Sequence, residues 1–182
     1  MRLSTLDAIT AAQEAKRPVV RAVRVPDGEE HVLFGDHEDP LNAHARDILR
    51  SDRAASVEVD GERWFLQPFN PPLRLVLVGA VHIAQPLSRV ALLADYQVVV
   101  VDPREAFAHA DRFPGLTLSD DWPDEALDAL GVDARTAIVT LTHDPKLDDP
   151  ALEVALRSPA FYIGCLGSRR THAARLGRLE KK

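Results

Sequence analysis

LRLVLVGAVHIA, at residues 73–84, is the most informative segment of the sequence for the fold. Its first six residues are apolar-rich, as in a buried strand, and Gly79 begins a tight turn into a helix. A second apolar run, Gln97 to Val101, ends at Asp102. This order is typical of the first βαβ unit of a dinucleotide-binding fold. One position departs from the pattern Gly-x-Gly-x-x-Gly/Ala: the second glycine is replaced by Val81, whose branched side chain would crowd a pyrophosphate.

Composition excludes several classes of protein. With 182 residues, 46% of them hydrophobic and 27% charged, the chain is neither disordered nor collagen-like. A net charge of -6 argues against nucleic acid as a partner, and no apolar run is long enough to cross a membrane. The single cysteine, Cys165, excludes an internal disulfide and a multi-cysteine metal cage. We therefore expect a cytoplasmic protein with no nucleic-acid or membrane partner.

The chain is expected to divide at Asn70-Pro71-Pro72, because consecutive prolines favour an extended connector. Residues 1–70 predict a small α+β domain, whose free sheet edges are compatible with a homodimer. Ser4 or Thr5 is expected to cap a first helix that carries Leu6, Ile9 and Ala12 on one face. The other expected elements are strands at 19–25, 31–34, 55–59 and 63–67, a helix at 41–49, and turns at Pro26-Asp27-Gly28 and Asp60-Gly61.

Residues 71–182 predict an α/β, Rossmann-like domain with a doubly wound, mostly parallel sheet, because strands alternate with helices. The expected strands are 73–78, 97–101, 116–118, 136–141 and 161–163. The expected helices are 82–93, a short one near Ala106, 123–130 capped by Asp120 or Asp121, one containing 151–156, and a last one opened by Ser168.

In such sheets ligands bind beyond the carboxyl ends of the strands. The residues that follow the predicted strands are therefore the binding candidates: Gly79, Ala80, His82, Asp102, Arg104, Thr142, His143, Asp144, Gly164, Gly167, Ser168, Arg169 and Arg170. We expect these loops to converge on one crevice. No residue is assigned a catalytic role or a metal.

Several candidates have two interpretations. The loop at 164–170 offers glycines, a hydroxyl and paired arginines to an anion. Asp102 binds a ribose hydroxyl or is a solvated helix cap, and His82 contacts a ligand or is a polar residue of a first helical turn. His143 and Asp144 favour simple ligand contact over an acid/base pair, because adjacent loop residues often point apart.

The remaining polar residues favour structural interpretations. Cys165 is a sulfur carrier or, more in keeping with a small apolar residue, part of the core. The acids Asp144, Asp148 and Asp149 lack the strict spacing of a cation site and predict a solvated loop. The basic residues of the last helix, namely Arg175, Arg178, Lys181 and Lys182, predict a solvated face.

Four blocks in order along the chain carry a family resemblance: GAVHIAQPL at 79–87, VDPR at 101–104, THDPKLD at 142–148 and YIGCLGSRRTH at 162–172. They resemble the C-terminal Rossmann domain of the xanthine dehydrogenase accessory factor (XdhC/CoxI) family. The resemblance implies a cytoplasmic bacterial protein that binds phosphorylated molybdopterin, the molybdenum cofactor, helps its sulfuration and delivers it to the apoenzyme of a molybdenum hydroxylase. It implies a cofactor-handling accessory protein more than a turnover enzyme.

The chain departs from that family at three places. Val81 stands where the family usually has a glycine, residues 35–39 lack the family's N-terminal cysteine, and the chain stops at Lys182 where the family's domain continues. The last departure predicts either a shortened relative or a truncated chain. Two alternatives stay open: an NAD(P)-dependent oxidoreductase that uses Asp102 for the ribose, which Val81 opposes, and a non-catalytic Rossmann docking module.

Overall fold

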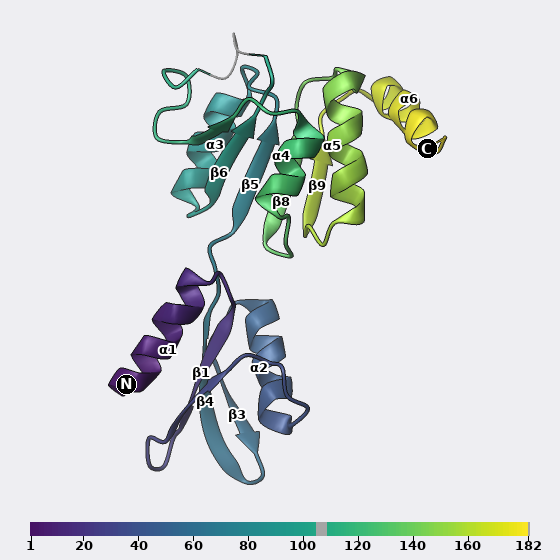
Figure 1. The fold of residues 1–182 in the computed structure, drawn as a ribbon. Coiled ribbons are helices and arrows are strands. Elements are labelled where there is room, and N and C mark those ends of the chain that lie inside the picture. The colour runs from purple at the N-terminus through teal and green to yellow at the C-terminus, as the bar shows by residue number, and fades with distance from the viewer. Residues whose placement is uncertain (105–108, 182) are drawn as a thin grey trace. The chain divides into compact units, whose positions relative to one another are not determined.

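The computed structural model describes residues 1–104 and 109–181. The chain forms two compact units, Met1–Pro71 and Pro72–Lys182 (Figure 1). The short helix expected near Ala106 and the side chain of Lys182 lie outside the described residues.

The N-terminal unit is a four-stranded antiparallel sheet of order β2-β1-β4-β3 with a helix on each face. Ala45 and Ile48 of one helix pack on one face, and Ile9 and Ala12 of the other pack against Val19 on the opposite face. The expected strands, turns and second helix are confirmed. The elements are α1 (Leu3–Glu14), β1 (Val19–Arg24), β2 (Glu30–Leu33), α2 (Pro40–Ser51), β3 (Ala55–Val59) and β4 (Glu62–Phe69).

The predicted start of α1 is wrong. The helix follows Arg2, so Ser4 and Thr5 lie inside it, and Leu6 is exposed. The carboxylate of Glu30, from β2, accepts hydrogen bonds from the Arg2 N–H and the Thr5 hydroxyl, both at 2.8 Å. An acid from another element therefore accepts a hydrogen bond from a backbone N–H at the start of α1, where the sequence had predicted a local capping residue.

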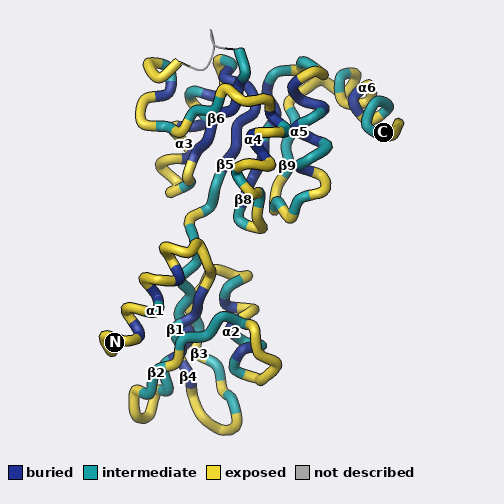
Figure 2. Tube along the Cα trace, viewed as in Figure 1, coloured by how far each residue is buried: buried dark blue, intermediate teal, exposed yellow. Residues whose placement is uncertain are grey.

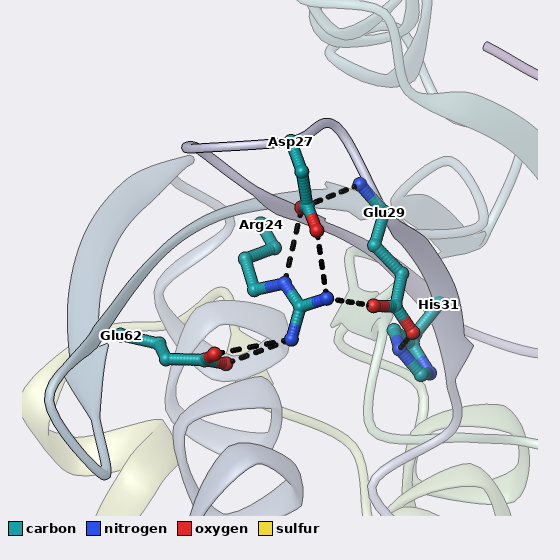
Figure 3. Close-up of polar contacts among 5 residues, drawn as sticks. All are labelled: Arg24, Asp27, Glu29, His31 and Glu62. Carbon is teal, nitrogen blue, oxygen red and sulfur yellow. Dashed lines mark hydrogen bonds and ion pairs between the residues drawn. The ribbon is translucent and has the colours of Figure 1, made fainter.

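A polar cluster centred on Arg24 ties together the two turns at one end of this sheet (Figure 3). The guanidinium donates to Asp27 in the β1–β2 turn, to Glu62 at the start of β4, and to Glu29. Hydrogen bonds to Asp27 and then Glu62 raise the pKa of Arg24 above its ordinary value, although burial opposes the rise. His31 Nε2 lies 2.9 Å from Glu29 and extends the cluster along β2.

The C-terminal unit is a five-stranded parallel sheet of order β7-β6-β5-β8-β9, which confirms the Rossmann-like α/β fold. Its first strand lies in the middle and the strand order reverses beside it, between β5 and β8. The elements are β5 (Arg74–Val78), α3 (Ala84–Leu93), β6 (Gln97–Val101), β7 (Thr117–Ser119), α4 (Pro123–Leu130), β8 (Thr136–Thr140), α5 (Pro145–Arg157), β9 (Tyr162–Cys165) and α6 (Arg169–Leu179).

Alternate residues of the central strand point to opposite faces, and both faces are covered. Leu75 and Leu77 pack with Ala84 and Ala91 of α3, whereas Val76 and Val78 pack with residues of α4 and α5. In Figure 2 the inner strands are accordingly dark blue. Burial on both faces explains why the strands are nearly continuous apolar runs.

The helices of this unit differ from expectation in one cap, one start and one loop assignment, while α4 has the predicted bounds. The residue before α4 is Trp122, whose side chain makes no capping bond, so neither Asp120 nor Asp121 caps this helix. Helix α3 begins at Ala84, two residues after the expected start. Helix α5 begins at Pro145 with Asp144 as its N-cap, so Asp148 and Asp149 belong to a helix and not to a solvated loop. No helix in the described part of the chain has the length and apolarity to cross a bilayer.

Candidate functional site

The loops that follow the parallel strands meet at one edge of the sheet. The last residues of neighbouring strands are in register, with Val78 beside both Val101 and Thr140. Backbone hydrogen bonds continue past the strands: Gly79 N–H to Val101 O at 2.8 Å, and Leu166 N–H to Thr140 O at 2.9 Å. The four segments that hold the predicted site residues therefore lie along one rim.

Gly79 brings the loop after β5 against the loop after β8. Its φ is +108°, and a Cβ built on it would lie 2.4 Å from Thr142 Cγ2. Only glycine fits both the conformation and the space. The contact lies at the reversal in strand order, which is where open α/β sheets bind ligands.

Asp102 holds the turn after β5 through a hydrogen bond to its backbone. It is fully buried, its Oδ2 accepts the Ala80 N–H at 2.8 Å, and both of its oxygens accept hydrogen bonds from Arg104. Burial acts to raise the pKa of Asp102, but the hydrogen bonds from Arg104 and Ala80 outweigh it, and the pKa lies below its ordinary value. The interpretation of Asp102 as a solvated helix cap is wrong.

Arg104 is held by this acid yet partly open to solvent, with 36% of its side chain exposed. Hydrogen bonding to Asp102 raises the pKa of Arg104, burial opposes the rise, and the charges of Asp144 and Asp148 add to it. The guanidinium thus interacts electrostatically with the loop after β8 as well as with its own loop.

The loop after β8 is organised by Asp148, which is 1% exposed. Its carboxylate accepts a hydrogen bond from the Thr142 hydroxyl at 2.6 Å and one from the His143 N–H at 3.1 Å. The Asp144 carboxylate caps α5 through the Lys146 N–H at 2.9 Å, and His143 is exposed with a φ of +63°. Asp144 is thus engaged as the N-cap of α5.

The loop after β9 leads into α6. Ser168 caps this helix as expected, since its hydroxyl accepts the Thr171 N–H at 3.2 Å. Arg169 and Arg170 are exposed at the same rim, as is His82 after β5. A Cβ on Gly164 would lie 2.8 Å from the Tyr162 ring, which gives this glycine a packing role. Cys165 is only half-buried, so the core interpretation is wrong for it.

The expectation of a solvated basic face on α6 is wrong for two arginines. Arg175 is 2% exposed and donates to Asp148 at 3.2 Å and to Leu166 O at 3.1 Å. Arg178 donates to both oxygens of Asp149 at 2.6 and 2.9 Å. Sequence reasoning missed these pairs, although neighbouring acids on one helix and arginines three residues apart on the next were a signal for them.

No group of three or more His, Cys, Asp or Glu side chains able to hold a metal ion occurs among the described residues. The rim instead offers cationic side chains and glycine-lined backbone. It therefore has the chemistry to hold an anion.

Residues 75–182 match the family model of the XdhC Rossmann domain. The chain belongs to the XdhC family. Over 113 residues it is 30% identical to the molybdenum cofactor insertion chaperone PaoD of Escherichia coli (strain K12), a match that covers 62% of this chain and 29% of PaoD. Over 105 residues it is 30% identical to a probable xanthine dehydrogenase subunit of Bacillus subtilis (strain 168), covering 57% of this chain and 32% of that protein.

The fold of this XdhC-family chain also matches a solved structure. A xanthine dehydrogenase from Bacillus halodurans matches 96% of this chain and 53% of its own, with a TM-score of 0.72 and 20% identity. This likeness shows a common fold for nearly all of the chain. The chain matches only about a third of the length of the two curated relatives.

Proposed function

We propose that this XdhC-family chain is an accessory protein of a molybdenum hydroxylase, which binds the phosphorylated molybdenum cofactor at the carboxyl edge of its parallel sheet and passes it to the apoenzyme. The cofactor is cargo in this proposal. The observation that carries it is the convergence at one rim of four loops joined by direct hydrogen bonds and by the Gly79–Thr142 contact. The insertion-chaperone role of PaoD supports the choice of cargo.

The residues at the rim suit an anionic guest. Arg104, held by Asp102, presents a guanidinium from the loop after β6, and Arg169 and Arg170 present two more at the start of α6. His82 and His143 are exposed beside them as further donors. Gly79 lets the backbone after β5 pack directly against Thr142, which joins the loops after β5 and β8 at the reversal in strand order.

Val81 directs the phosphate group elsewhere along the same rim. The residue is half-buried and packs against the core cluster that contains Ala84, and it replaces the glycine that a dinucleotide fold uses to bring backbone close to pyrophosphate. The loop at 164–170, with Gly164, Gly167 and Ser168, is the alternative anion-binding turn.

Direct binding tests this function. The purified chain is incubated with molybdopterin released from a molybdoenzyme, and retained pterin is measured by fluorescence after gel filtration. We expect binding by the wild type and binding at least about tenfold weaker in the double variant Arg169→Ala/Arg170→Ala, because charge-assisted contacts are lost.

A matched control is Arg157→Ala. Arg157 is an exposed arginine of the same unit, but it lies at the C-terminal end of α5, away from the rim. We expect no change in pterin binding. Absence of binding by the wild type would reject the proposal and favour a docking module that has kept only the fold.

A nicotinamide-dependent oxidoreductase is disfavoured by the state of Asp102. Its carboxylate accepts one hydrogen bond from Ala80 N–H and three from Arg104, which fills the roughly four acceptor positions of a carboxylate. A ribose hydroxyl would have to displace one of these donors. We expect no thermal shift with millimolar NAD or NADP, whereas binding at 100 times the dissociation constant would stabilise the protein by about 2.7 kcal/mol.

A further inference from the structure

Arg175 has a buried guanidinium group, and only one of its three nitrogens makes hydrogen bonds within the described residues. One terminal nitrogen, Nη2, donates to Asp148 and to Leu166 O. The other nitrogens, Nε and Nη1, are buried and have no hydrogen-bond partner in the described part of the chain. A guanidinium has five N–H donors, so three are unused, and buried donors without acceptors are costly.

The unused side of Arg175 lies under the turn that opens α6. A Cβ built on Gly167 would lie 3.8 Å from Nη1, so the guanidinium sits directly beneath this glycine. Leu166 to Arg170 are all exposed, which leaves the turn above Nη1 as a thin, solvent-facing layer. This turn is therefore the part of the protein that separates Nη1 from solvent.

The backbone of the same turn is also short of acceptors. Among the residues described, the N–H groups of 167–170 have no hydrogen-bond partner, because Ser168 caps only the N–H of Thr171. Helix α6 is eleven residues long, so its first turn carries the partial positive charge of a helix N-terminus. Neither Arg169 nor Arg170 is paired with a carboxylate within the described residues.

We propose that the Gly167–Ser168 turn, the N-terminus of α6 and the guanidinium of Arg175 form a binding subsite for a phosphate monoester, in which Nη1 of Arg175 donates to a phosphate oxygen. The carboxylate of Asp148 balances the positive charge of Arg175 and orients the plane of its guanidinium group. Arg169 and Arg170 supply the two positive charges that balance a dianion. The choice of a phosphate monoester rests on the proposed function, whereas the anion-binding geometry does not.

Arg178 provides a matched control on the same helix. It lies three residues after Arg175 and pairs with Asp149, the neighbour of Asp148, but it is 39% exposed. Replacing either arginine removes one positive charge and one ion pair between α5 and α6. Only Arg175 lies beneath the turn, so only its replacement is expected to affect anion binding.

The test titrates the full chain with inorganic phosphate, followed by calorimetry or by the amide signals of 167–170. We expect Arg175→Met to weaken phosphate binding at least about tenfold and Arg178→Met to leave it within about twofold. Gly167→Ala leaves every charge in place but puts a methyl group above Nη1, and it is expected to weaken binding to a similar extent. Arg175→Met combined with Asp148→Asn avoids an unpaired buried carboxylate and secures a folded variant.

Equal phosphate affinity in the Arg175 and Arg178 variants overturns the subsite, as does a wild type that binds no phosphate. Molybdopterin added to the same set of variants separates the two proposals. If the wild type binds molybdopterin and the Arg175 variants bind it equally well, the subsite fails and the function stands. If phosphate binding depends on Arg175 but molybdopterin is not bound, the subsite stands and the function fails.

Discussion

At the level of single residues, buried acids hold together the loops at the carboxyl edge of the parallel sheet. Asp102 fastens the turn after β5 to Arg104, and Asp148 fastens the loop after β8 to α6 through Arg175. Each carboxylate is almost fully buried and accepts hydrogen bonds from backbone and side chain alike. In the proposed site, both acids act as positioning residues for the side chains and backbone around them.

Asp102→Ala is expected to destabilise the C-terminal unit by about 2 kcal/mol, the cost of leaving the buried Ala80 N–H without an acceptor. Arg104 is partly exposed and can turn to water, so its loss of a partner adds little. Denaturant unfolding at pH 7 measures the difference. Asp120→Ala, at an exposed aspartate of the same unit, is the control, and an equal effect at both positions would contradict the assignment.

We expect the N-terminal unit to lose stability at acid pH, because Glu30 must be ionised to hold its hydrogen bonds. Hydrogen bonds from the Arg2 N–H and the Arg21 guanidinium, with a smaller contribution from Thr5, lower the pKa of Glu30 to about 2. A lowered pKa in the folded state means stability that is complete above the ordinary value of 4.5 and is lost as the pH falls towards about 2.

Wild type and Glu30→Gln are therefore expected to differ in unfolding temperature at pH 6 and to converge near pH 2. Circular dichroism melts across this range provide the measurement. Glu58→Gln, at an exposed position of the same sheet, is expected to track the wild type throughout. A constant gap between Glu30→Gln and the wild type down to pH 2 would be inconsistent with the lowered pKa.

Residue-scale prediction from sequence succeeded where the interaction is local. Ser168 was predicted as a cap because its partner, the Thr171 N–H, lies three residues away. Arg175 was missed because Asp148 lies 27 residues away, and nothing local distinguishes a buried arginine from a solvated one on an exposed helix. The hydrogen bond from the Arg2 N–H, at the start of α1, to Glu30 was missed for the same reason, since Glu30 comes from another element.

At the scale of elements, the turn between β5 and α3 sets the spacing of the rim. Gly79→Ala is expected to cost about 3 kcal/mol or more, because an alanine at a φ of +108° is strained and its Cβ meets Thr142 Cγ2 at 2.4 Å. Adding Thr142→Ser removes that methyl group but keeps the hydroxyl that binds Asp148. The double variant should recover part of the loss, and chemical denaturation measures both.

Gly177→Ala is the matched glycine control. Gly177 lies inside α6 with open space around its Cβ position, so the substitution is expected to stabilise the helix by about 0.5–1 kcal/mol. Destabilisation at Gly177 comparable to that at Gly79 would show that the proposed contact is not the cause.

At the scale of the whole molecule, each unit has its own buried core. The N-terminal unit packs around Val20, Ala45 and Leu66, and the C-terminal unit packs on both faces of β5. We expect the units to unfold as separate transitions, and residues 72–182 to fold when produced alone, because each compact unit contains a hydrophobic core of its own.

The two tryptophans allow this to be measured, since Trp64 lies in one unit and Trp122 in the other. Single-tryptophan variants, Trp64→Phe and Trp122→Phe, report the units separately by fluorescence. Asp102→Ala should shift only the Trp122 transition and Glu30→Gln only the Trp64 transition. Coincident transitions in both reporters would contradict independent folding.

The fold class, the order of strands and helices, and the set of loops at the rim could all be predicted from the sequence, because apolar periodicity and turn residues act over a few neighbouring positions. The role of each polar residue at the rim became clear from the three-dimensional contacts. Arg104 donates hydrogen bonds to both carboxylate oxygens of Asp102. Asp148 links α5 to the loop after β8 and to α6, and Arg175 has N–H donors without acceptors beneath Gly167. Burial and pairing of charges depend on contacts between distant segments, which no local pattern encodes.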